Sequence, residues 1–314
     1  LTGTTVGFTD GQLTLDGVKH QLNVLADVGH TPNLTVSGQF GTLSPADSTA
    51  LLALVPDIVN DPGAGVTFPQ GAISLTADAV SYAGLTGHQL DLEGKWGGGA
   101  IEISRLSADD LGGIRFNVGL ALSGTFVKPR ISGDGQIGIG RGGGPALDRL
   151  FDWLGTPAGA RALLVRSLPA TLKAHLDDPD NSGAQGLSLS GKAGAADVTF
   201  LAQLNGGVLK PSQGPVDATV SLDSSDPAAF TAQLGLGDVS LMAASGPMTL
   251  AARATGDPAG SMAANIDLED GGDSISFNGS VTPGGLTAIA GNGKLRLTLA
   301  DSTALAAELG LGGL

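Results

Sequence analysis

Hydrophobic and polar residues alternate along most of the chain, which is typical of β-strands with one apolar face and one polar face. The clearest example begins at Ile114, where one parity is apolar as far as Phe126 and the other carries Arg115, Asn117 and Ser123. The same alternation predicts further strands near residues 12–17, 20–24, 34–40, 72–77, 89–94, 100–104, 172–176, 187–191, 197–205, 216–222, 239–241, 248–252, 264–268, 274–281 and 295–300. Short turns rich in Gly, Asp and Pro separate them, so we expect neighbouring strands to pair antiparallel in a long meander.

Three segments repeat one pattern, an alternating strand followed by a short Ala/Leu helix with Asp at its start. The helices are expected after Ser44-Pro45 and Asp47, after Asp226, and after Asp301. In each copy, Asp or Ser is placed to accept the first free helix amides, and Gly or Pro is placed to end the helix. The sequence therefore predicts a repeat protein.

The alternation is interrupted once, by the glycine run 138–144 and two segments with helical spacing. Leu147, Leu150, Phe151 and Leu154 recur at helical intervals, and a second helix is expected from Thr156-Pro157 to Pro169. We therefore divide the chain into a β-groove repeat segment at 1–139, a helical insert at 140–169 and a second β-groove repeat segment at 170–314. The three are expected to form one continuous, elongated domain.

The composition indicates more aliphatic surface than a compact domain requires, so we expect part of that surface to contact an apolar partner. The chain of 314 residues contains 51 Gly, is 41% hydrophobic, 4% aromatic and 15% charged, and has a mean hydropathy of +0.20. Ordinary soluble domains carry about 25% charged residues. The absence of Cys excludes disulfides, thiolate metal sites and Cys nucleophiles. A net charge of −14 argues against nucleic acid as a partner and, more weakly, against an anionic membrane surface.

No apolar run approaches the roughly 18–20 residues that span a bilayer. Because Leu1 is neither an initiator Met nor part of a leader, we expect the chain to be a segment of a longer protein.

Several stretches together resemble the periplasmic repeat region of the bacterial AsmA family, including its TamB-like and YhdP-like relatives. The resemblance rests on the helix at 226–236, which begins with Asp, and on the strand after it at 245–253, which begins with Ser-Gly-Pro. It rests also on the sequence segments 103–114 and 122–126. That family is grouped with bridge-like lipid transfer proteins. The resemblance implies a periplasmic location, an inner-membrane anchor outside this chain, envelope protein partners, a role in outer-membrane biogenesis and no single essential residue.

Sites of other kinds have weaker support. The glycine run at 138–144 lies between a strand and a helix, as a phosphate-binding loop does, but no βαβ unit surrounds it, which favours a flexible joint. The acidic segments 177–181 and 267–273 lack the spacing of a calcium loop, so solvated turns are favoured. The four His residues are scattered, so each is interpreted as a lone side chain on a polar strand face. No catalytic motif is present, and we expect no enzyme activity, cofactor or metal.

The strongest functional signal is distributed along the apolar strand faces. If these strands curl into an open groove, their inner faces form an aliphatic lining. The candidate lining residues are Leu90, Leu92, Ile101, Ile103, Ile114, Phe116, Val118, Leu120, Leu122, Val198, Phe200, Leu204, Leu295, Leu297 and Leu299. The alternative is that the same residues form a dry sandwich core. Low aromatic content favours the groove, because a closed core of this size would use more aromatic side chains to fill space.

We therefore expect a mainly β, antiparallel repeat protein curled into an open hydrophobic groove, with short helices and one helical insert. The expected function is a non-catalytic conduit that shields the acyl chains of phospholipid or another amphiphile between the inner and outer membranes. The alternatives are a structural or adhesive β-repeat stalk and an outer-membrane protein assembly factor that pairs its sheet edge with substrate strands.

Overall fold

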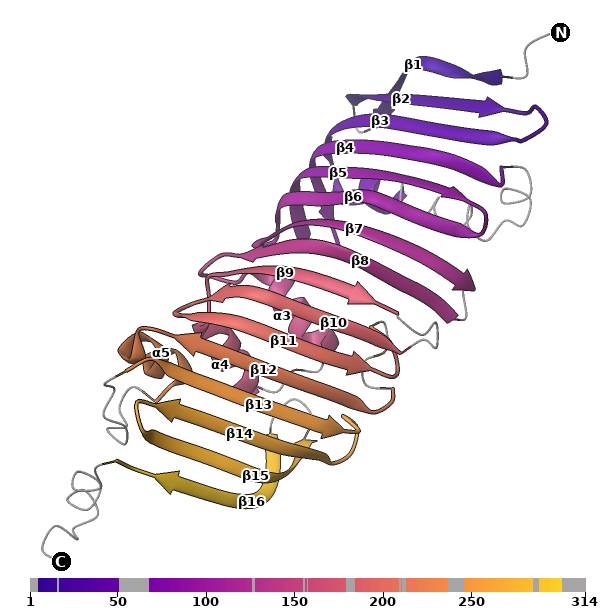
Figure 1. Ribbon diagram of the computed structural model, residues 1–314. Helices are drawn as coiled ribbons and strands as arrows, with labels where there is room; N and C mark the ends of the chain where they lie inside the picture. Colours follow the sequence, from indigo (N-terminus) through magenta and orange to yellow (C-terminus); the bar gives the residue numbers. More distant parts are fainter. Residues whose placement is uncertain are drawn as a thin grey trace, which may run out of the picture. The chain divides into compact units, whose positions relative to one another are not determined.

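A computed structural model shows a mainly β protein whose strands follow one another in chain order (Figure 1). The structure describes residues 5–15, 17–50, 68–125, 128–154, 156, 158–178, 184–208, 210, 213–236, 246–284 and 288–300. This part of the chain contains sixteen strands and, besides the helical residues 45–50, three short helices. It divides into two compact units, of which the first comprises 1–137 and 144–147 and the second 138–143 and 148–314.

The first unit holds a sheet in which strands β1 to β8 lie in sequence order. The strands are β1 (Thr5–Leu15), β2 (Val18–Asp27), β3 (Asn33–Leu43), β4 (Gln70–Tyr82), β5 (Leu85–Gly97), β6 (Ala100–Leu111), β7 (Ile114–Thr125) and β8 (Lys128–Ile139). The last two residues of β8 belong to the second unit. Strand pairs are antiparallel from β1 to β3 and from β4 to β7.

One pair departs from the expected meander. Strands β3 and β4 are parallel, with Val36 opposite Ile73. The expectation of uniformly antiparallel neighbours was wrong here because the connection 44–69 is long enough to return the chain to the same end of the sheet. A helix was expected in this connection, but the antiparallel prediction for all neighbouring strands was drawn from the short Gly, Asp and Pro turns.

The strands of the first unit are bent (Figure 1). The register of β6 shifts against β5 opposite Glu93 and Gly94, and against β7 between Ile103 and Leu106 and between Ala108 and Leu111; in each case the extra residue lies in β6. Bulges of this kind leave one residue unpaired, bend the strand and increase its twist. They give β6 a curvature that regular pairing would not.

The second unit repeats the same design with fully antiparallel pairing from β9 to β16. The strands are β9 (Ala170–Asp177), β10 (Gln185–Ala193), β11 (Ala196–Leu204), β12 (Val216–Ser224), β13 (Met248–Gly256), β14 (Met262–Asp270), β15 (Asp273–Gly284) and β16 (Ala288–Thr298). These bounds overlap the predicted strands and extend most of them by a few residues, but β16 begins at Ala288 and ends at Thr298 where 295–300 was predicted. The strand expected at 239–241 lies outside the described residues.

The middle repeat helix has the predicted caps. Helix α5 (Pro227–Leu234) begins after Asp226, whose side chain accepts a 3.0 Å hydrogen bond from the Ala229 amide. It ends at Gly235, which has a φ of 78°, a left-handed conformation that suits glycine. In the first copy, Ser44 caps the helical residues 45–50, because its Oγ accepts from the Asp47 amide at 3.1 Å. The third copy, from Asp301 onward, lies outside the described residues.

Helix α5 covers one end of the sheet in the second unit. Phe230 of the helix and Met248 of β13 are fully buried and form a core cluster with Ala196 and Leu268. Gln233 fixes the helix to the β10–β11 turn, because it accepts a 2.8 Å hydrogen bond from the Ala195 amide and donates to the Ala193 carbonyl at 3.2 Å. The repeat helix is therefore a local cover held by apolar and polar contacts.

Two helices occupy the predicted insert. Helix α3 (Pro145–Leu154) buries Leu147 and Phe151, and helix α4 (Ala158–Arg166) follows it. Arg161 of α4 forms a 2.8 Å ion pair with Asp152 of α3. Its guanidinium also lies over the Phe151 ring. None of the described helices is long and apolar enough to cross a membrane.

Candidate functional site: an apolar sheet face

In the first unit, strand register aligns apolar side chains of successive strands into rows on one face, called here the apolar face. Residues directly opposite each other in a ladder point to the same side of the sheet. One row contains Phe8, Val24, Val36, Ile73, Gly94, Ile103 and Leu120. The next contains Gly11, Leu22, Gly38, Leu75, Leu92, Leu106 and Val118. Each row thus crosses seven strands without a charged residue.

A third row on this face includes a large aromatic residue accommodated by a glycine. Trp96 lies opposite Gly71 on one side and Ile101 on the other, and Ile101 lies opposite Leu122. A side chain on Gly71 would collide with the Trp96 ring. The indole Nε1 donates a 3.2 Å hydrogen bond to the Phe68 carbonyl, so the ring is held in place over the sheet.

The second unit has an apolar face of the same construction. One row contains Leu172, Gly191, Val198, Leu222, Leu250, Leu268, Ile275 and Leu297. The next contains Ala174, Leu189, Phe200, Val220, Ala252, Ile266, Phe277 and Leu295. The alternation seen in the sequence therefore becomes continuous apolar stripes that cross eight strands.

The apolar faces are only partly covered. In the first unit, all apolar side chains of the two rows given above are half-buried or exposed. Ile101 is 44% exposed and Ile266 is 38% exposed, although both lie on interior strands. Full burial on this side of the second unit is concentrated at its ends, as at Leu268 under helix α5 and at Leu204. No second sheet packs on either apolar face among the residues that the structure describes.

The predicted lining residues fall into two groups. Those from Leu90 to Leu122 share the apolar face of the first unit, and Val198, Phe200, Leu295 and Leu297 share that of the second. Leu204 lies on the same face near its margin and is 7% exposed, whereas Leu299 follows the end of β16. Phe126 lies outside the described residues. The role of these residues as a lining stays a prediction.

Sequence reasoning missed several members of the rows, although the signal was present. Val36, Ile73, Val220, Ile266 and Phe277 follow the same period-two alternation as the residues that were selected. Which of them lie side by side depends on register, and the bulges in β6 and the parallel β3–β4 pair set that register. The sequence shows the alternation but not these shifts.

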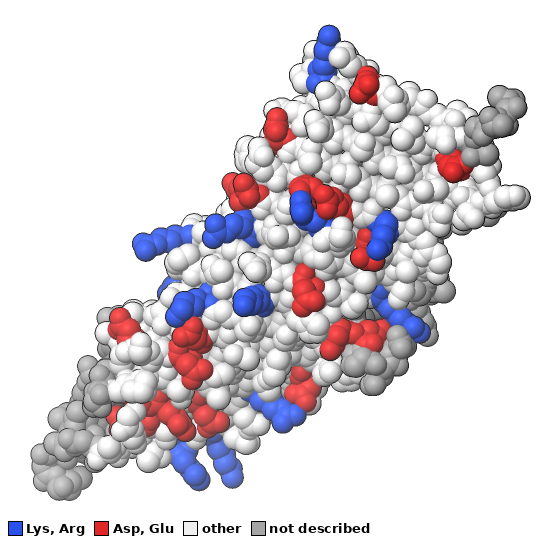
Figure 2. Space-filling model, turned by 45° about the horizontal axis from the view of Figure 1, so that its top comes forward, with Lys and Arg blue, Asp and Glu red and all other residues white. Residues whose placement is uncertain are grey.

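The opposite face of each sheet is polar and carries paired charges. On the first unit, Arg105 lies 2.8 Å from Asp91 and 3.8 Å from Glu93, and its pKa is raised by the hydrogen bond to Asp91 and by both carboxylates. On the second, Arg253 contacts both carboxylate oxygens of Asp217, at 3.0 and 2.6 Å. This contact lowers the pKa of Asp217. Figure 2 shows acidic and basic side chains interspersed rather than gathered by sign.

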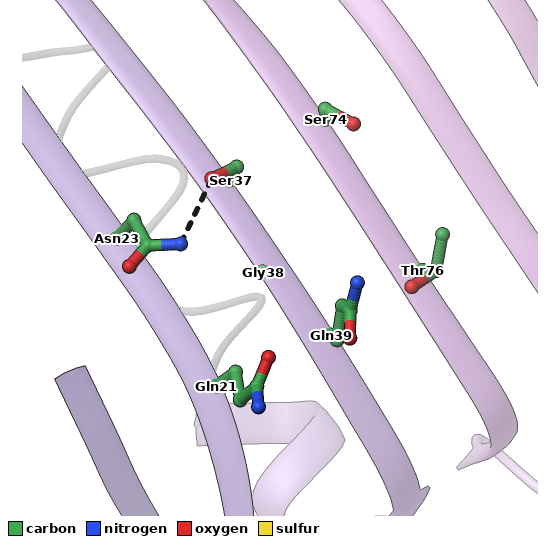
Figure 3. A pocket seen from close by; sticks show the side chains of 7 residues that line it. All are labelled: Gln21, Asn23, Ser37, Gly38, Gln39, Ser74 and Thr76. Carbon is green, nitrogen blue, oxygen red and sulfur yellow. Dashed lines mark hydrogen bonds between the residues drawn. The ribbon is translucent and has the colours of Figure 1, made fainter. Parts of the chain in front are cut away.

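A shallow hollow on the polar face contains only amide, hydroxyl and backbone groups. It lies over β2, β3 and β4 and is lined by Gln21, Asn23, Ser37, Gly38, Gln39, Ser74 and Thr76 (Figure 3). The Asn23 amide donates a 3.3 Å hydrogen bond to the Ser37 hydroxyl. Without apolar or charged side chains, this hollow cannot shield an acyl chain and has no group suited to acid–base catalysis.

Backbone amides at the glycine run and at the start of α3 are bonded to carbonyls of the chain. The turn of the glycine run is closed by a 3.0 Å hydrogen bond from the Gly143 amide to the Gly140 carbonyl. At the start of α3, the Ala146 amide donates to the Gly112 carbonyl at 3.2 Å. Because a phosphate-binding loop needs such amides for its ligand, the geometry agrees with a structural turn.

Two interpretations of polar residues were wrong. His20 lies on the apolar face, 2% exposed, and its Nδ1 accepts a 3.2 Å hydrogen bond from the Gly41 amide. Asp270 and Asp273 are 2% and 7% exposed, so these two carboxylates are not solvated, although Gly271 and Gly272 between them are exposed. In both cases the sequence did not show what would cover the strand end. Within the described ranges, three or more metal-ligating side chains do not come together.

Comparisons with known protein families, with curated proteins and with solved structures give no match. The resemblance to the AsmA family therefore stays a prediction.

Proposed function

We propose that the chain is a non-catalytic lipid carrier whose apolar sheet faces shield the acyl chains of phospholipid or another amphiphile. The observation that carries the proposal is the exposure of aliphatic side chains on interior strands, at Ile101 and Ile266 in particular. A dry sandwich core would bury these positions. An acyl chain lying along a row would be withdrawn from water there.

The physical basis is apolar transfer. Each buried CH₂ group contributes about 0.8 kcal/mol. Since the rows repeat across strands with similar side chains, an acyl chain meets many near-equivalent positions and no single deep trap. The opposite face of each sheet is polar and carries ion pairs, so it remains compatible with water.

The proposal includes the setting expected from the sequence. The chain would act in a periplasm, as part of a longer protein held by an inner-membrane anchor, and would pass phospholipid between the two membranes with envelope proteins at its ends. The lipid head group would remain at the open side, in water.

Native mass spectrometry with lipid extraction tests the proposal on the chain purified in mild detergent from bacterial membranes. We expect stoichiometric phospholipid. The variants Ile101→Asp and Val118→Asp place a charge on the apolar face and should lose at least half of the bound phospholipid. Asn117→Asp, on the polar face of β7, should retain the bound phospholipid. Ile101 is already exposed, so its substitution should leave the fold intact.

Circular dichroism establishes that each variant is folded. A folded, lipid-free wild-type chain would contradict the carrier and favour the structural stalk. Equal lipid loss in Asn117→Asp would show that binding does not depend on the apolar face.

A further inference from the structure

The hairpin between β14 and β15 buries two carboxylates at its turn. Asp270 and Asp273 are direct cross-strand partners on either side of Gly271-Gly272. They lie on the same face as Leu268 and Ile275, and Asp270 is also opposite the fully buried Met248. The pairing with Met248 places Asp270 beside the core cluster under α5, and the two carboxylates are only 2% and 7% exposed.

The carboxylate of Asp270 lacks a hydrogen-bond partner. Neither of its oxygens forms a hydrogen bond. Asp273 Oδ1 accepts a 2.7 Å hydrogen bond from the Ala300 amide, which orients that carboxylate at the end of β16. A buried ionised carboxylate without a partner is strongly unfavourable, and two like charges directly opposite each other add repulsion.

The repeat supplies an internal comparison. The β10–β11 hairpin has the same two-residue turn, and there the directly opposed residues are Ala193 and Ala196. Its polar backbone groups are satisfied by the Gln233 amide of α5. Because that hairpin folds without acidic residues at this position, the two carboxylates of the β14–β15 hairpin are not required by the hairpin itself.

We propose that Asp270 and Asp273 bind a divalent cation, with Ca²⁺ as the best match. A cation between the two side chains would compensate both charges and give the oxygens of Asp270 a ligand. Carboxylate oxygens without His or Cys suit hard cations, and Ca²⁺ takes its remaining ligands from carbonyls and water. With two acidic residues, we expect a dissociation constant of about 10⁻⁴ to 10⁻³ M, the range of extracellular calcium modules.

The test is thermal and denaturant unfolding of the whole chain in EDTA and in CaCl₂ up to 10 mM, together with calorimetric titration of CaCl₂. A dissociation constant of about 1 mM predicts that 10 mM Ca²⁺ raises the folded-to-unfolded ratio about 11-fold. Asp270→Asn should remove this response and should be more stable than the wild type in EDTA, because it removes a buried charge.

The matched control is Asp267→Asn, which removes an exposed carboxylate from the polar face of the same strand. It should keep the full calcium response. The proposal is overturned if the wild type shows neither stabilisation nor heat of binding at 10 mM Ca²⁺, or if Asp270→Asn retains the response. A response lost equally in Asp267→Asn would show general charge screening and would also overturn it. The outcome is independent of lipid binding.

Discussion

At the scale of single residues, the ion pair of Asp217 with Arg253 predicts a measurable pH dependence. Both guanidinium contacts and a 3.1 Å hydrogen bond from Thr255 favour the ionised carboxylate, so the pKa of Asp217 is lower in the folded chain than in the unfolded chain. The stabilisation is therefore present above the unfolded pKa of about 3.9 and is lost as the pH falls through the folded pKa.

Asp217→Asn should consequently unfold more easily than the wild type near neutral pH, and the difference should shrink below about pH 4. Urea unfolding at several pH values measures it. Asp267→Asn, on the same face, provides the control for loss of one exposed carboxylate. A difference between Asp217→Asn and wild type that stays constant down to pH 2 would contradict the assigned role of the pair.

Single residues also show where sequence reasoning succeeds. The Asp226 cap and the Gly235 stop follow from local chemistry and could be predicted. The burial of Asp270 and His20 could not, because it depends on which segments cover the strand ends. The segment Asp-Gly-Gly-Asp at 270–273 could have indicated that the two Asp residues are paired, since a two-residue turn makes its flanking residues cross-strand neighbours.

At the scale of elements, helix α5 should depend on Gln233 for its attachment. Gln233 is 6% exposed and donates to Ser167 Oγ at 3.0 Å, in addition to its two bonds with the β10–β11 turn. Gln233→Ala should cost roughly 2–3 kcal/mol of unfolding free energy, because it leaves buried backbone groups unpaired.

Chemical denaturation measures this cost. The control is Gln203→Ala, at an exposed position on the polar face of β11, which should change the unfolding free energy by less than about 0.5 kcal/mol. If the two variants had the same stability, the hydrogen bonds of Gln233 would not hold the helix.

The strands and helices themselves were largely predictable, because period-two and helical spacing are local. The parallel β3–β4 pair was not, since it depends on where a long connection returns the chain.

At the scale of the whole molecule, the two units share one design, in which register turns a local alternation into apolar rows on one face and paired charges on the other. The sequence could indicate the two-sided strands. It could not distinguish an open face from a closed core, because both use the same period. The exposure of Ile101 and Ile266 on interior strands is the structural observation that favours the open face.

The most direct test of the carrier is a comparison of the two faces of one strand. The chain has no native Cys, so Ile266→Cys on the apolar face and Asn265→Cys on the polar face can each carry one environment-sensitive fluorophore. On titration with a short-chain phospholipid below its critical micelle concentration, we predict a blue shift and increased intensity for the label at position 266 and no change at 265. An unchanged label at 266, or equal changes at both positions, would contradict the proposal that this apolar face binds acyl chains.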